Sequence, residues 1–303
     1  MHKFHGILVV VALLLMVSVS ACGYALPPEV IAQEEVSSEA AVDGEAAENT
    51  VLELDPQNFS DSTNIDNEWW PLKPGTQHVY EGFTLEEDEE IPHRIVFTVT
   101  DLTKVINGVR TVVIFDRDYS EDMLEESELA FFAQDDDGNV WHFGQYRETY
   151  DEVEFVGGRV WLIDLPAGSK AGIMMPAEPQ VDAPSYSQGY APAPFNWTDR
   201  ARVNAVGQEL SAATGDYTDV LVIEEYNDEE PGAFQLKYYA RGVGNIAVGW
   251  RGDDTQQEEL ELVEIIELGP DALAEIRAEA LMLEERAYMY SFTQSAEPMP
   301  SAE

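Results

Sequence analysis

Short apolar runs recur along the middle of the chain, separated by turns rich in Gly, Asn and Asp. The runs are four to six residues long or alternate with polar residues, and they favour Val, Ile, Phe and Tyr, a pattern typical of β-strands. The pattern predicts strands at 95–99, 111–115, 128–133, 139–143, 220–223, 235–240, 245–250 and 258–267.

One stretch near the end of the chain has helical spacing. Pro270 suits the first position of a helix because it has no N–H to leave unpaired. Apolar residues then recur three or four positions apart, at 273, 276, 280, 283 and 287. This spacing predicts a helix over about 270–288 with an apolar stripe facing a sheet. The alternative is a frayed helix on the surface.

Two blocks of predicted strands align when the chain is shifted by 107 positions. Gly108 then meets Gly215, and the run Phe131–Gln134 meets Tyr238–Arg241. We interpret this as a duplication with repeats at about 92–146 and 199–250, each a four-stranded antiparallel meander. The alternative is two meanders that look alike without common origin. The expected fold is mainly β, with the meanders forming a curved sheet or a sandwich, plus the C-terminal helix.

The segment Leu165–Asp199 joins the two repeats and is rich in proline. It carries proline at 166, 176, 179, 184, 192 and 194, so we expect an irregular loop. Loops of this length are commonly functional or lie across an open sheet face.

The first residues have the layout of a secretory signal. Lys3 precedes an apolar run over 7–19, and small residues follow. The sequence Val19-Ser20-Ala21-Cys22 resembles the lipobox of bacterial lipoprotein signals. That resemblance implies a signal peptide over 1–21, acylation of Cys22, and anchoring at the extracytoplasmic face of the cell membrane through the covalent lipid. The alternatives are an ordinary cleaved signal with an incidental cysteine, and an uncleaved anchor.

Cys22 is the one cysteine in the chain, so the folded domain has no internal disulfide. Residues 22–50 are rich in Ala, Glu, Ser and Pro without an apolar period, and we expect a disordered acidic tether. Residues 51–290 then form a single β-rich domain, and 291–303 form a second disordered tail.

The charge balance is strongly acidic. The chain has 16 Lys and Arg against 59 Asp and Glu, a net charge of −43. A surface of this sign repels nucleic acid, so we exclude DNA and RNA as partners. Three interpretations stay open: solubility, diffuse binding of divalent cations, and recognition of a cationic partner. Since 45% of residues are hydrophobic, the chain is globular rather than a disordered polyanion.

Several motifs resemble an uncharacterised family of bacterial secreted proteins and lipoproteins. They are Trp70-Pro71-Leu72-Lys73-Pro74-Gly75-Thr76, Gly138-Asn139-Val140-Trp141, and Lys237-Tyr238-Tyr239-Ala240-Arg241-Gly242-Val243-Gly244. The resemblance covers roughly residues 59–250. It implies a β-rich extracytoplasmic domain, and it implies no activity, since none is assigned to the family.

Two acidic groups are candidate calcium ligands. Asp116, Asp118 and Asp122 have the spacing of an EF-hand loop, but Glu121 stands where the sharp turn needs Gly and Ser127 where a bidentate Glu is needed. A looser hard-cation site in the hairpin, together with Glu125 and Glu126, is the candidate instead, and the alternative is a solvated acidic connection. Three further carboxylates precede Gly138 in a turn, and turns also use Asp for backbone geometry alone. These are Asp135, Asp136 and Asp137. No other cofactor is expected.

No catalytic residue is predicted, because the histidines are scattered and the nucleophile motif G-x-S-x-G is missing from the sequence. Trp69, Trp70 and Trp197 are candidate ligand contacts, with burial in the core as the alternative. We expect a non-enzymatic lipoprotein that binds an unidentified ligand or envelope partner, or maintains the envelope. The alternatives are a structural component without a ligand and a hydrolase that uses acidic residues. Converging carboxylates would favour the hydrolase. A pocket lined by Trp and Met would favour ligand binding, and a filled sheet face would favour the structural role.

Overall fold

The computed structural model describes residues 53–86, 89–151, 154–193, 195–287 and 296–300. The predictions for the signal peptide, Cys22, the tether over 22–50 and most of the tail over 291–303 lie outside the described residues. All of the described residues belong to one compact unit, Ala47–Glu303.

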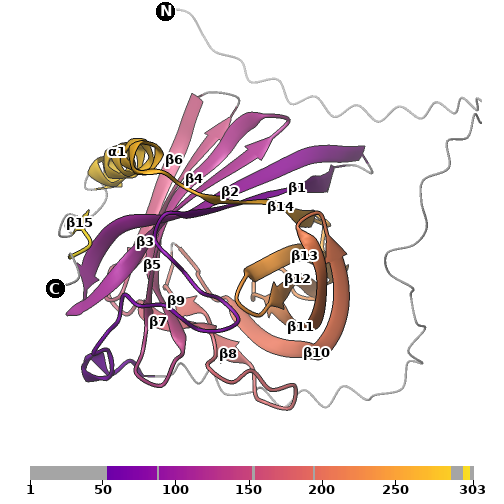
Figure 1. Cartoon of the computed structure of the whole chain (residues 1–303), viewed down its shortest axis with the longest axis horizontal. Coiled ribbons are helices and arrows are strands. Elements are labelled where there is room, and N and C mark those ends of the chain that lie inside the picture. Colours follow the sequence, from indigo (N-terminus) through magenta and orange to yellow (C-terminus); the bar gives the residue numbers. More distant parts are fainter. Residues whose placement is uncertain (1–52, 87–88, 152–153, 194, 288–295, 301–303) are drawn as a thin grey trace, which may run out of the picture. The chain divides into compact units, whose positions relative to one another are not determined.

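Antiparallel strands make up most of this unit, as the sequence pattern predicts (Figure 1). A short 3₁₀ helix, η1 (Pro56–Asn58), precedes them, and one α-helix, α1 (Pro270–Ala287), follows β14. The strands are β1 (Thr76–Glu86), β2 (Glu89–Ile106), β3 (Val109–Ser120), β4 (Met123–Gln134), β5 (Val140–Asp151), β6 (Glu154–Leu162), β7 (Lys170–Met175), β8 (Tyr186–Ser187), β9 (Gly189–Tyr190), β10 (Arg200–Ala212), β11 (Gly215–Tyr226), β12 (Ala233–Ala240), β13 (Gly244–Gly252), β14 (Glu259–Glu267) and β15 (Glu297–Pro298).

The strands form one sheet, which decides between the predicted curved sheet and the sandwich. Its order is β8-β10-β11-β12-β13-β14-β1-β2-β3-β4-β5-β7-β9, with β6 paired to β5 and β15 to β2. Each predicted repeat is a four-stranded meander, β2–β5 and β10–β13, and the pair β14–β1 joins them. The duplication itself stays a prediction.

The two ends of the sheet meet at one short segment. β8 pairs with β10 at one end and β9 pairs with β7 at the other, and only Gln188 separates β8 from β9. Gly172 on β7 permits this closure, because a Cβ there would lie 2.1 Å from the backbone nitrogen of Gly189. The sheet is therefore bent around its own interior.

The prediction that 165–199 is wholly irregular is wrong for β7, which pairs with β5. The physical reason is the position of the prolines. Pro166 and Pro176 flank β7 without interrupting it, so every residue of the strand keeps the N–H that a ladder needs.

The helix covers one face of the sheet (Figure 1). Ile276, Ala280, Leu283 and Ala287 pack with Leu102, Phe131 and Phe143 in one core cluster, so the predicted apolar stripe is confirmed. The opposite face carries a second cluster that includes Ile114, Phe132 and Tyr239. No helix in the described part of the chain is long and apolar enough to cross a bilayer.

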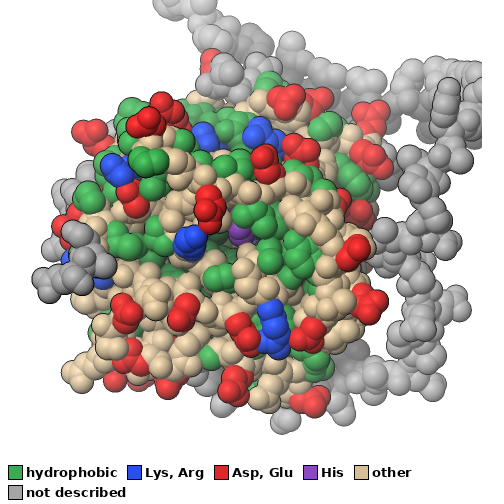
Figure 2. Space-filling model, in the orientation of Figure 1, with side chains coloured by type: hydrophobic (Ala, Val, Ile, Leu, Met, Phe, Trp, Pro, Cys, Tyr) green, Lys and Arg blue, Asp and Glu red, His purple; other side chains and the backbone are tan. Residues whose placement is uncertain are grey.

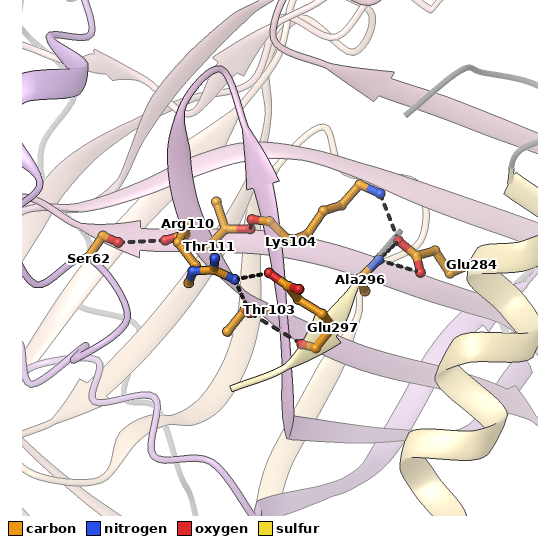
Figure 3. A network of polar contacts seen from close by, with 8 residues as sticks. All are labelled: Ser62, Thr103, Lys104, Arg110, Thr111, Glu284, Ala296 and Glu297. Atoms are coloured by element: carbon orange, nitrogen blue, oxygen red, sulfur yellow. Dashed lines mark hydrogen bonds and ion pairs between the residues drawn. The ribbon is translucent and has the colours of Figure 1, made fainter. Parts of the chain in front are cut away.

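A polar network ties the C-terminal segment to β2 (Figure 3). The ammonium of Lys104 lies 2.7 Å from the carboxylate of Glu284 on α1, and both side chains are almost fully buried. The backbone N–H of Ala296 donates to the same carboxylate at 2.9 Å. Glu297 in β15 pairs with Arg110 at 2.5 Å. The tail was predicted to be disordered over 291–303, but its described part is ordered because β15 adds to the edge of β2.

Candidate functional site

A cavity of about 790 Å³ lies on the sheet face opposite α1, within the bend of the sheet. Strands of both meanders and the pair β14–β1 contribute side chains to its wall. Strand alternation explains its character, because every second residue points inward. On β3, Ile114 is followed on the same face by Asp116 and Asp118, so the wall changes from apolar to acidic along the strand.

The acidic side chains of neighbouring strands face one another in register. Asp116 is paired with Glu128 on β4, and Asp118 is paired with Glu126. Carboxylates directly opposite each other on adjacent strands repel when ionised. The pair Asp116–Glu128 has no ion-pair partner among the described residues, so its repulsion is the less compensated of the two.

Burial and this repulsion raise carboxyl pKa values in the cavity. Burial first, then the charges of Glu128 and Asp118, raises the pKa of Asp116 well above its ordinary range. Burial is also the main cause that raises the pKa of Glu128 to about 7, although Arg147 acts in the opposite direction. The pKa of Asp199 rises to about 7 through burial and the nearby Glu225. The positive charge of Lys237 lowers the pKa of all three carboxyls, and that of Arg147 lowers the pKa of Glu128 and Asp199, but burial outweighs both.

The basic side chains of the cavity already have carboxylate partners. Lys237 lies 3.0 Å from Glu225, and Arg147 lies 2.9 Å from Glu126. His93 has its Nε2 2.9 Å from Asp118. Burial lowers the pKa of His93, but the neighbouring carboxylates outweigh burial and raise it overall.

Carboxylates outnumber bases in the cavity wall. Nine acidic side chains line it against two basic ones, so carboxyl groups outnumber bases by seven. The nine acidic side chains of the cavity wall are Glu86, Asp116, Asp118, Glu125, Glu126, Glu128, Asp199, Glu225 and Glu258. Acidic side chains are also spread over the face seen in Figure 2, with few Lys and Arg among them.

Aromatic side chains form the other part of the wall. Trp70 lies edge-on to Phe132 with ring centres 4.9 Å apart. His142 stacks on the same phenyl ring, also at 4.9 Å, and its ring centre is 5.9 Å from that of Trp197. The cavity is thus both acidic and aromatic, as the carbon surface of Tyr239 and Phe97 also lines it.

His142 presents an unsatisfied polar atom in this wall. Only 4% of the residue is exposed. Its Nδ1 lies 3.2 Å from the carbonyl oxygen of Gln188, so Nδ1 carries the proton, and Nε2 has no partner among the described residues. Burial lowers the pKa of His142 to about 4, so the ring is neutral and Nε2 is a hydrogen-bond acceptor.

The structure separates the predicted calcium candidates. Asp116 and Asp118 line the cavity, whereas Asp122 is exposed in the turn between β3 and β4. Within the described ranges no three His, Cys, Asp or Glu side chains group closely enough to hold a metal ion.

The second acidic group, before Gly138, organises its own turn. The carboxylate of Asp135 accepts from the backbone N–H of Asn139 at 2.8 Å and from Trp141 Nε1 at 2.7 Å. Asp136 accepts from the backbone N–H and hydroxyl of Ser60. Asp137 accepts from the side chain of Asn58. Each of the three carboxylates therefore has a structural partner.

Two of the three candidate tryptophans lie in the cavity wall, and the third lies in the core. Trp70 and Trp197 line the cavity. Trp69 is 4% exposed and lies in the core, where the guanidinium of Arg241 sits 3.9 Å from its ring centre. Trp69 is outside the cavity wall.

Sequence reasoning missed most of the charged cavity residues. Glu125 and Glu126 are predicted from the sequence as candidate cation ligands, and both line the cavity. Glu128 was missed but carried a usable signal, because it extends the inward face of Ala130 and Phe132 by strand alternation. Asp199 and Glu258 lie just outside strands, and no local pattern marks them as inward-facing. Their position depends on how the sheet bends.

No protein-family model matches the chain, and no curated protein matches its sequence. Two solved structures are similar to it. A protein of Bacteroides fragilis NCTC 9343, predicted to be exported and with a YmcC-like fold, has 12% sequence identity and a TM-score of 0.38, over 66% of this chain and 99% of that one. A predicted lipoprotein of Parabacteroides distasonis ATCC 8503 has 9% identity and a TM-score of 0.35, over 66% of this chain and 100% of that one.

Proposed function

We propose that this protein is a membrane-anchored extracytoplasmic lipoprotein that binds a small molecule in the cavity of its curved sheet without transforming it. Cys22 carries the lipid, and the acidic tether connects the anchor to the β domain. The bilayer is the partner of the anchor, and the cavity holds the ligand.

The cavity is the observation that supports binding. Its volume of about 790 Å³ falls within the range of about 300–1,000 Å³ typical of small-molecule sites. Its wall is more polar than that of most such sites, and it combines aromatic surface with nine acidic side chains, which suits a polar ligand. A purely structural sheet would bring apolar side chains together there and leave little space.

A second candidate function rests on the carboxyl pair of β3 and β4. A carboxyl that stays protonated near neutral pH, as Glu128 does with a pKa of about 7, can act as a general acid. The opposing Asp116 would supply the second carboxyl of a hydrolase. Turnover of a bound compound would distinguish this function from binding alone.

A thermal-shift screen of the detergent-purified lipoprotein tests the binding function. The screen contains organic amines, phosphorylated anions, neutral sugars and long-chain apolar compounds. A ligand present at about 100 times its Kd stabilises the folded state by about 2.7 kcal/mol, which raises the Tm of a domain of this size by several degrees. We expect at least one class to produce such a shift.

The variant Thr149→Trp locates the effect, because Thr149 lines the cavity and an indole would fill part of it. Thr218→Trp is the matched control, since Thr218 is exposed on β11 outside the cavity. The shift should persist in Thr218→Trp and disappear in Thr149→Trp. If no class of compound shifts the wild-type Tm, or if both variants respond as the wild type does, the proposed function is refuted.

A further inference from the structure

We infer that the ligand of this cavity is an organic polycation, a molecule with two or more protonated amino groups joined by an apolar chain. This inference rests on the binding function proposed above and names the class of ligand. It follows from the charge excess, the unpaired buried atoms and the aromatic surface of the same cavity.

The charge excess sets the sign of the ligand. Lys237 and Arg147 are the two bases of the wall, and each is held by a carboxylate, Glu225 and Glu126. An anionic ligand would have to displace those partners and enter a cavity in which carboxyl groups outnumber bases by seven. A cationic ligand would instead meet carboxyl groups, and two of them, Asp116 and Glu128, have no ion pair among the described residues.

Asp116 and Glu128 are the clearest of these carboxylates. Asp116 Oδ1 is buried without a hydrogen-bond partner among the described residues. Glu128 accepts from the neutral side chain of Gln145 at 2.7 Å, which supplies no charge. Because the two are register partners, one ammonium group placed between them would relieve their mutual repulsion and pair with both. The raised pKa values of both carboxyls agree with a missing cation.

His142 adds a second, independent acceptor. Its Nε2 is unpartnered among the described residues, and the residue is 4% exposed. An unprotonated imidazole nitrogen can accept a hydrogen bond from an ammonium N–H. It has no proton to donate to an anion. The residue stacks on Phe132 within the aromatic part of the wall. The acceptors of the cavity thus lie in both its acidic and its aromatic part, which suits a ligand with more than one amino group.

The shape of the site favours an organic cation over a metal ion. Calcium takes six to eight oxygen ligands at about 2.3–2.6 Å from one point. Within the described residues the carboxylates form no such group, and they are distributed around a cavity of about 790 Å³. The rings of Trp70 and Tyr239 line the space between them, where methylene groups would pack and ammonium groups would gain cation–π attraction. Lys237 illustrates this chemistry, because its own alkylammonium group lies in the cavity beside Glu225.

Calorimetric titration with spermidine, a linear trication, tests the inference at pH 8 and 150 mM salt. The cavity variant combines Asp116→Asn, Glu128→Gln and Asp199→Asn. The control variant combines Glu209→Gln, Glu275→Gln and Glu285→Gln, three exposed acids outside the cavity wall. Both remove three negative charges. We expect one spermidine per wild-type protein, affinity reduced about 100-fold in the cavity variant, and less than a threefold change in the control.

Each other outcome overturns the inference in a recognisable way. Equal weakening in both variants would mean diffuse attraction to an acidic surface. Displacement of spermidine by equimolar Ca²⁺ or Mg²⁺ would mean an inorganic cation site. If spermidine does not bind but another class of compound raises the Tm in the thermal-shift screen, the ligand class is refuted and the binding function is still supported. If circular dichroism shows that the triple variant is misfolded, the single variant Asp116→Asn should still weaken spermidine binding about tenfold. Unchanged binding in that single variant would refute the inference.

Discussion

Replacing Lys104 with methionine is expected to lower the free energy of unfolding by about 3–5 kcal/mol, because it leaves a buried carboxylate without its cation. Lys104 and Glu284 lie 2.7 Å apart with side chains 2% and 4% exposed. Glu284 also receives the N–H of Ala296, so the pair joins β2, α1 and the C-terminal segment (Figure 3). Urea denaturation of wild type and Lys104→Met measures the loss.

Lys73→Met is the matched control for this substitution. Lys73 and Glu267 are also 2.8 Å apart, but their side chains are 72% and 80% exposed. An exposed pair contributes about 0–1 kcal/mol, so the control should be nearly neutral. The double variant Lys104→Met with Glu284→Met should regain most of the lost stability, because no buried charge is then left alone. Equal effects of Lys104→Met and Lys73→Met would contradict the importance of burial.

Replacing Cys22 with alanine is expected to abolish acyl labelling and to change the distribution of the protein between membrane and soluble fractions. Each lipid CH₂ buried in the bilayer contributes about 0.8 kcal/mol, and stable anchoring takes two chains or one chain with a basic patch. With a net charge of −43, the chain offers no compensating attraction to anionic headgroups. We therefore expect the substitution to remove essentially all acyl-dependent membrane retention.

Fractionation and labelling with a fatty-acid analogue measure this effect in cells that express the full chain. Ser38→Ala, in the predicted tether, is the control and should behave as wild type. A wild-type protein that carries no acyl label, yet stays in the membrane fraction together with Cys22→Ala, would show that Cys22 is not the anchor.

The strands and the helix were predictable because their signals are local. The Asn107-Gly108 turn between β2 and β3 and the three-to-four residue stripe of α1 are each contained in a short window of sequence. The bend of the sheet was not predictable in this way. It depends on β8 and β9 pairing with distant strands on either side of Gln188, and no short window contains both contacts.

The same distinction applies to the candidate site. Asp116 and Trp70 were identified from local motifs, and both line the cavity. Asp116 faces inward from β3, whereas Asp122 is exposed because β3 ends at Ser120 and Asp122 lies in the turn to β4. Asp199 and Lys237 reach the cavity from the second meander, so their role becomes visible only when the sheet has closed.

The most direct test of the proposed cation site is the number of protons released when spermidine binds, measured by calorimetry at pH 7 in two buffers of different ionisation enthalpy. Glu128 and Asp199 have pKa values of about 7 in the free protein, so each is about half protonated at that pH. A bound cation favours the charged carboxylate and lowers both pKa values, so protons leave as the ligand enters. We expect release of at least about one proton per spermidine, about half from each of Glu128 and Asp199 and more if Asp116 is also protonated in the free protein. The Kd should rise at least about 100-fold from pH 8 to pH 6, where Glu128 and Asp199 are mostly protonated. No proton release with a Kd independent of pH, or tighter binding at pH 6, would contradict the proposed cation site.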